Sequence, residues 1–229
     1  SVDLSGSENP KTILMDGNKN VTATFTQITY TLDITIVGNG TVTSNPLTGP
    51  YPSGSSVTLT AEPDPGWVFS GWSVDLSGSE NPKTILMDGN KNVTATFTQI
   101  TYTLDITIVG NGTVTSNPLT GPYPSGSSVT LTAEPDPGWV FSGWSVDLSG
   151  SENPKTILMD GNKNVTATFT QITYTLDITI VGNGTVTSNP LTGPYPSGSS
   201  VTLTAEPDPG WVFSGWSVDL SGSENPKTI

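Results

Sequence analysis

The stretch YTLDITIVGNGTVTSNPLTGPYPSGSSVTLTAEPDPGWVFSGW, residues 30–72, decides the fold of this chain. It returns unchanged at Tyr102 and at Tyr174, and the sequence between the copies is unchanged as well. The stretch SVDLSGSENP begins at Ser1 and again at Ser73, so the period is 73 − 1 = 72 residues. Whatever the function is, a head-to-tail array of one small unit must carry it.

The repeat predicts a chain of small modules. If the unit opens at Tyr30, complete repeats span residues 30–101 and 102–173. Residues 1–29 are then the C-terminal part of a preceding repeat, and 174–229 form an incomplete repeat that lacks its last strand. We therefore expect the chain to be an excerpt from a longer array. A unit this small buries only about 60% of its unfolded surface, so each module is marginally stable alone.

The composition argues against several classes of function. The 229 residues contain no Cys and no His, which removes thiol chemistry, disulfides, the commonest general base and the commonest transition-metal ligand. The formal net charge of −13 argues against binding to nucleic acid or to an anionic membrane surface. No apolar run approaches the roughly 20 residues of a membrane span. We expect neither an enzyme nor a membrane-inserted protein.

Strict alternation of apolar and polar residues predicts β-strands throughout each unit. Residues 30–36, 57–61 and 21–26 each present one apolar face and one Thr-rich face, which is typical of antiparallel sheets with one wet side. The Gly38-Asn39-Gly40 turn is a strong hairpin signal between the strand 30–36 and the strand that follows it. The pattern predicts about six short strands per module and an all-β fold.

Two features of this pattern predict finer structure. Trp67 and Phe69 share one parity and Trp72 has the other, so a β-bulge at Ser70-Gly71 is needed to keep all three aromatic rings on the core side. The joint between modules, residues 26–29, contains no Gly, Pro or Ser, and apolar parity changes within it. We expect one strand to leave a module and enter the next, which predicts a rod-like array with stiff joints.

The unit resembles the divergent branch of the internalin-type B-repeats, the listerial–bacteroidal repeat family of bacterial surface proteins. The matching motifs are YTLxIxIVGNGTVT (30–43), GSSVTLTAxP (54–63), PGWVFSGWS (65–73) and the closing TIxMDGNKxVTATF (12–25). The resemblance covers the whole period. It implies an extracellular or cell-surface array of compact β modules, β-grasp-like or sandwich-like, that serves as a spacer or adhesive stalk and carries no catalytic motif. The perfect identity of the copies departs from natural members of the family, and an engineered concatemer would share it.

Three aromatic side chains are candidates for ligand contact. Trp67 and Trp72 form a platform for sugar stacking if they are exposed, but a unit this small needs its large aromatic residues inside. Tyr51, flanked by Pro50 and Pro52, is the better candidate for an exposed aromatic ring. It contacts a neighbouring module or chain, or else it caps an open end of the core.

Oxygen-rich and lysine-bearing segments offer two further hypotheses. The loop at residues 3–8 alternates oxygen-bearing side chains, and Glu62 and Asp64 add carboxylates, so calcium is an option, although the spacing matches no established calcium loop. The alternative is a solvated turn, and we expect no cofactor. A Lys–Asn isopeptide crosslink from Lys11 or Lys19 is chemically feasible, but no recognisable motif supports it.

Asparagine acceptor sequences recur in every unit. Asn20-Val-Thr and Asn39-Gly-Thr fit the N-glycosylation pattern, which returns at Asn92, Asn111, Asn164 and Asn183. Thr-rich strands also produce such matches by chance. The sequence leaves open whether these residues carry sugars.

These observations predict a structural segment of an extracellular fibre or surface stalk. Its partners are identical repeats or chains, joined through exposed strand edges. The ends suggest a specific route, because residues 1–29 supply a late strand and residues 174–229 lack one. The alternative is an adhesive module that binds a glycan or a host protein. The structural role predicted first, mechanical spacing with strand exchange, requires no cofactor.

Overall fold

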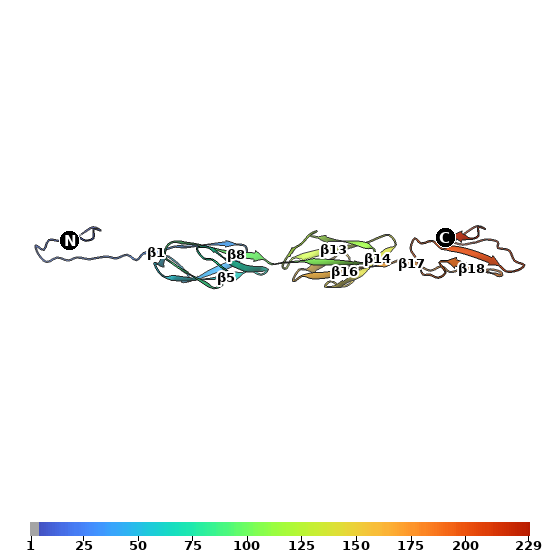
Figure 1. Cartoon of the computed structure of the whole chain (residues 1–229), viewed down its shortest axis with the longest axis horizontal. Coiled ribbons are helices and arrows are strands. Elements are labelled where there is room, and N and C mark those ends of the chain that lie inside the picture. Colours follow the sequence, from blue (N-terminus) through green and yellow to red (C-terminus); the bar gives the residue numbers. More distant parts are fainter. Residues whose placement is uncertain (1–4) are drawn as a thin grey trace. The chain divides into compact units, whose positions relative to one another are not determined.

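The computed structural model describes residues 5–229, which are all-β and contain no helix (Figure 1). The Asp3 and Leu4 of the predicted acidic loop lie outside the described residues. Within the described part, no helix is long and apolar enough to cross a membrane. The chain divides into two compact units, Ser1–Gln99 and Ile100–Ile229, which are considered separately.

The repeat 30–101 in the first unit is a sandwich of two three-stranded sheets. One sheet has the order β2-β8-β6 and the other has the order β3-β5-β7, while β1 and β4 form a two-residue ladder at the entrance. The six longer strands are those that the alternation predicts. The strands are β1 (Thr29–Tyr30), β2 (Leu32–Val37), β3 (Gly40–Asn45), β4 (Tyr51–Pro52), β5 (Ser56–Pro63), β6 (Trp67–Val74), β7 (Lys83–Leu86) and β8 (Lys91–Gln99).

The repeat 102–173 in the second unit has the same topology. Its sheets have the orders β10-β16-β14 and β11-β13-β15, and β9 pairs with β12. Its strands are β9 (Thr101–Tyr102), β10 (Leu104–Val109), β11 (Gly112–Asn117), β12 (Tyr123–Pro124), β13 (Ser128–Pro135), β14 (Trp139–Val146), β15 (Lys155–Leu158) and β16 (Lys163–Gln171).

The core of each complete module lies between its two sheets. Alternate residues of the central strands β5 and β8 are fully buried, and their threonines face outward. The buried set of the first module is Tyr51, Val57, Leu59, Ala61, Trp72, Leu76, Ile85, Met87, Val93, Ala95 and Phe97. The period-2 alternation therefore identified the inward face of these strands correctly.

The predicted hairpin at Gly38-Asn39-Gly40 is wrong. The turn carries the chain from β2 in one sheet to β3 in the other, and these two strands do not pair. Gly38 has φ +85°, a conformation that glycine adopts without strain. A Cβ at Gly38 would lie 2.2 Å from the carbonyl oxygen of Phe97, so the close approach of β8 leaves room for glycine alone at this position.

The expectation of purely antiparallel sheets is also wrong for one pair of strands in each module. β2 pairs with β8 in parallel, from Leu32 opposite Lys91 to Val37 opposite Thr96, and β10 pairs with β16 in the same way. Parallel neighbours need a long connection. Here the whole module is that connection, because its first long strand lies beside its last.

The predicted bulge is confirmed. The register of β6 against β8 shifts between Phe69 and Gly71, and Gly71 has φ +151°. Phe69 and Trp72 therefore lie on the same side, with ring centroids 4.8 Å apart. The extra residue in the bulge keeps Trp72 on the core side of β6, although its position has the opposite parity to that of Phe69.

One strained residue stands at the end of β6 and of β14. Val74 and Val146 have φ of 77° and 78°, and a β-branched residue rarely adopts this left-handed conformation. Both side chains are exposed, so their apolar surface adds little to the core. The backbone conformation at these positions therefore destabilises the folded modules.

Replacing both strained valines with Asn is expected to stabilise the modules. Asn tolerates the left-handed region, so V74N with V146N should raise the unfolding free energy by about 1 kcal/mol per module. The measurement is chemical denaturation monitored by tryptophan fluorescence. The matched control is V68N with V140N, exposed positions in the same strands, which should give no gain. If the two double variants had equal unfolding free energies, the conclusion that Val74 and Val146 are strained would be contradicted.

Candidate functional site

Residues 174–229 form one three-stranded sheet, whereas each complete module has two. β18 (Gly184–Asn189), β20 (Thr202–Pro207) and β21 (Lys227–Thr228) form the sheet that corresponds to β3-β5-β7. β17 (Thr173–Tyr174) and β19 (Tyr195–Pro196) form the entrance ladder. Residues 176–181 and 211–215, which would form the flanking strands of the other sheet, adopt no strand. In the complete modules, β8 or β16 is the central strand between these two segments.

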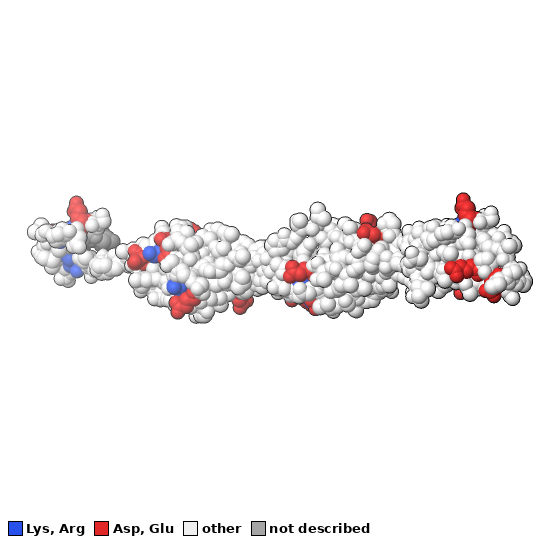
Figure 2. All heavy atoms as spheres, turned by 45° about the vertical axis from the view of Figure 1, so that its right-hand side comes forward, with Lys and Arg blue, Asp and Glu red and all other residues white. Residues whose placement is uncertain are grey.

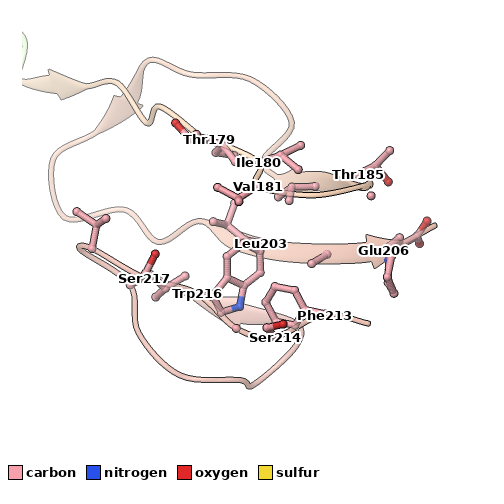
Figure 3. Close-up of a pocket in the computed structure, with 18 of the residues that line it drawn as sticks. Thr179, Ile180, Val181, Thr185, Leu203, Glu206, Phe213, Ser214, Trp216 and Ser217 are labelled. Carbon is pink, nitrogen blue, oxygen red and sulfur yellow. The ribbon is translucent and has the colours of Figure 1, made fainter. Parts of the chain in front are cut away.

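A cavity of about 800 Å³ occupies the place of that strand (Figure 3). Its walls are formed by residues 176–181 and 211–218, and Leu203 of β20 contributes to its base. Figure 3 shows Phe213 and Trp216 side by side on one segment, and their ring centroids are 4.9 Å apart. We call this cavity the open groove. It is lined largely by apolar side chains that would form the core of a complete module.

The complete modules show what fills this space. In the first module β8 lies between β2 and β6, and its Val93, Ala95 and Phe97 point into the core. The Phe97 ring packs against Gly40, where an added Cβ would lie 2.6 Å from two ring carbons. At the corresponding Gly184, the three atoms nearest to an added Cβ are backbone atoms of Glu206 and Pro207.

The sequence of β8 and β16 occurs a third time, near the start of the chain. Residues 19–27 have the sequence KNVTATFTQ, identical to β8 and β16. They form no β-ladder in the described part of the chain. Phe25 is 93% exposed, whereas the identical Phe97 is 3% exposed. Residues 19–27 are therefore an exposed copy of a strand that is buried in both complete modules.

The joint between repeats is well defined inside the second unit. Ile172 follows β16, and its N–H donates to the carbonyl of Gly138 in the preceding repeat at 2.8 Å. Its carbonyl accepts the N–H of Ser197 in the next repeat at 2.8 Å, and the ladder of β17 with β19 follows directly. This joint is strand-like, as the sequence predicts, and backbone hydrogen bonds tie it to both repeats.

Comparison with known proteins assigns the repeat. The divergent InlB B-repeat domain matches residues 30–101, 102–173 and 174–229. The chain belongs to this family. The B-repeat is a repeat domain of bacterial surface proteins and is not known as enzymatic, so this chain is a surface repeat region. No curated protein and no solved structure matches the chain.

The B-repeat fold places the three candidate aromatic residues in or against the core. Trp72 is buried and donates its indole N–H to the carbonyl of Glu80 at 2.9 Å, while Trp67 is half-buried. Tyr51 is 6% exposed, so its proposed role as an exposed contact is wrong for the complete module. It caps the core instead, with its hydroxyl near the carbonyl of Pro46. The glycan-binding hypothesis thereby loses two of its three proposed residues.

The acidic loop is seen in its second copy, residues 75–80. The Asp75 carboxylate accepts the N–H of Asn92 at 2.7 Å, and Leu76 is buried in the core. The described residues contain no group of three or more His, Cys, Asp or Glu side chains placed to hold a metal ion. The loop contacts observed here are structural: they attach the loop to β8.

Lysines pair with neighbouring acids on the surface. Lys91 Nζ lies 2.6 Å from Asp88 Oδ1, and this hydrogen bond lowers the pKa of Asp88 and raises that of Lys91. The isopeptide candidates Lys11 and Lys19 make comparable ion pairs with Glu8 and Asp16. On the face shown in Figure 2 the charged groups are sparse and scattered. Such exposed pairs contribute little to stability.

The acceptor asparagines occupy two kinds of position. Asn39 lies in the turn between the sheets, and Asn92 lies near the start of β8. Both are exposed, as are Asn111 and Asn164. Asp33 is exposed on the outer face of β2, as the alternation predicts.

Sequence reasoning missed two sets of residues that hold the strands of a module in place. The glycines that flank Asn39 were interpreted as a hairpin, but they form the hollow for Phe97. Asn81 was not noticed, although its side chain bonds both the N–H and the carbonyl of Ala61, at 2.9 and 2.7 Å. For the glycines, the available signal was the inward-facing position of Phe97 in the alternation, since a large inward ring needs a hollow to receive it. No sequence pattern marks the second.

Proposed function

We propose that this B-repeat chain is a structural segment of an extracellular stalk or fibre, which extends by head-to-tail stacking of identical modules and joins chains by strand exchange. The observation that carries the proposal is the joint at Ile172, where backbone hydrogen bonds to Gly138 and from Ser197 tie consecutive identical repeats together. Family membership supports the surface location. The hydrogen-bonded joint at Ile172 supports extension by stacking.

The occupant of the groove is residues 19–27 of a second copy of this chain. The complete modules supply the register: Phe25 would lie opposite Phe213, and Ala23 opposite Trp216, as Phe97 and Ala95 lie opposite Phe69 and Trp72. The strand would run parallel to residues 176–181, as β8 runs parallel to β2. This is β-strand addition, in which backbone bonds supply affinity and side-chain pockets supply specificity.

Energetics favour the insertion. The sequences of the groove segments and of residues 19–27 form hydrogen-bonded ladders in the complete modules, so insertion would add such a ladder. Burying the Phe25 and Val21 side chains contributes about 1.5–3 kcal/mol each. Since donor and acceptor lie in different repeats of each chain, every added copy presents a new groove, and the contact is heterologous and open-ended.

The experiment compares the assembly of four chains by analytical ultracentrifugation and electron microscopy. The wild-type chain is expected to form species that lengthen with concentration. F25A should remain monomeric, because loss of a buried Phe costs about 3–5 kcal/mol, more than a hundredfold in Kd. The control T24A changes an outward-facing neighbour and should assemble like wild type. A chain of residues 30–173 lacks donor and acceptor and should stay monomeric.

Two results would overturn strand exchange. One is undiminished assembly of residues 30–173, which would place the contact elsewhere. The other is a wild-type chain that remains monomeric at every concentration. Extension by stacking would survive both results, because the joint at Ile172 lies within one chain.

A further inference from the structure

The chain enters and leaves each complete module through neighbouring strands. In the second unit it enters through β10 and leaves through β16, which pair in parallel from Leu104 opposite Lys163 to Val109 opposite Thr168. Entry is at the Leu104 end of this ladder, and exit is beyond Thr168 at the other end. In the first unit β2 and β8 have the same relation (Figure 1).

This arrangement determines how the module responds to tension applied along the chain. Tension would draw β10 backward along its own axis and β16 forward along its own. The bonds of a parallel ladder are evenly spaced along the strands. They would therefore be loaded together, in shear. A ladder pulled from one end only would open bond by bond.

Additional contacts hold the two ends of this ladder. At the entry end, the N–H of Lys163 donates to the carbonyl of Thr103 at 2.9 Å, and the N–H of Thr103 donates to Asn162 Oδ1 at 3.0 Å. At the far end Gly110 packs so closely that an added Cβ would lie 2.2 Å from the Phe169 carbonyl oxygen. The opposite edge of β16 is paired along its length with β14.

We propose that the β2–β8 and β10–β16 ladders are load-bearing clamps, which keep each complete module folded when the chain is pulled along its length. This inference rests on the proposed stalk function, since a stalk is what transmits tension. It goes beyond that function in assigning force resistance to one pair of strands. It does not depend on strand exchange between chains, so it is tested on single molecules.

The chain contains its own control for this proposal. Among the described residues 5–229, no strand pairs with residues 176–181 of the repeat 174–229. This repeat should therefore extend without a force peak, whereas the two complete modules should each give one. Each event should release roughly 230 Å of chain, less the length of the folded module, because about 70 residues extend at about 3.3 Å each. Complete modules that extend at the same low force as residues 174–229 would overturn the proposal.

A change of pulling direction separates the clamp from general stability. The chain contains no Cys, so introduced cysteines define the pulling points without ambiguity. Asn111 and Gln171 are exposed and lie at the same end of the second module. Pulling between N111C and Q171C should peel the ladder from that end, and the rupture force should be well below that for the chain termini. Equal forces in both geometries would contradict shear loading.

A matched pair of substitutions completes the test. N90A with N162A removes a side-chain bond at the loaded end of each clamp and should lower the rupture force of both events. N81A with N153A removes two bonds per module outside the clamp. It should cost more in chemical denaturation but leave the rupture force unchanged. If N81A with N153A lowered the rupture force more than N90A with N162A, the assignment of the clamp to these ladders would be refuted.

Discussion

Appending the next stretch of the period, LMDGNKNVTATFTQ, after Ile229 is expected to complete the third module and to abolish self-association. This sequence is that of residues 86–99, whose last nine residues form β8 in the first module. A covalently attached strand needs no association step, which for a separate chain costs about 4–15 kcal/mol. It should therefore fill the open groove before a strand from another chain does.

The completed module should be visible by two measurements. Trp211 is 50% exposed in the open repeat, so its emission should shift to shorter wavelength when the strand covers it. Sedimentation should show a monomer at concentrations where the original chain assembles. The matched control carries the same extension with its single Phe changed to Ala, which should bind the groove poorly and leave assembly in place. An extended chain that folds its third module and still assembles would contradict strand exchange.

F169A is expected to unfold the second complete module or leave it marginally stable. Phe169 is buried, its ring lies against Gly112, and its centroid is 5.7 Å from that of Phe141. Loss of a buried Phe costs about 3–5 kcal/mol. Total stabilities of about 5–15 kcal/mol are usual for domains, and a module this small is expected near the lower limit.

The control for this effect is the same residue in another copy of the same sequence. Phe25 has identical sequence neighbours on both sides but is almost fully exposed. F25A should leave the thermal unfolding of the monomeric chain unchanged, as measured by calorimetry at a concentration too low for assembly. Equal destabilisation of the monomer by F25A and F169A would contradict the observation that Phe25 is exposed and Phe169 is buried.

The period-2 alternation determined much of this protein from the sequence alone. The recurrence of identical sequence gives the 72-residue period. The six long strands, the inward faces, the bulge before Gly71 and the strand-like joint follow from which residues are apolar and where parity changes. These are local properties, because side-chain direction alternates along any strand.

Only the tertiary structure decided which strands are neighbours. Alternation specifies a face but not a partner, so Gly38-Asn39-Gly40 has the sequence of a hairpin and yet connects two sheets. The parallel pairing of β2 with β8 joins the two ends of a module, and no local pattern encodes that contact. Tyr51 is buried for the same reason, because strands distant in sequence enclose it. The buried face of a strand is set by its own sequence, but its neighbouring strands depend on how the whole module buries its apolar surface.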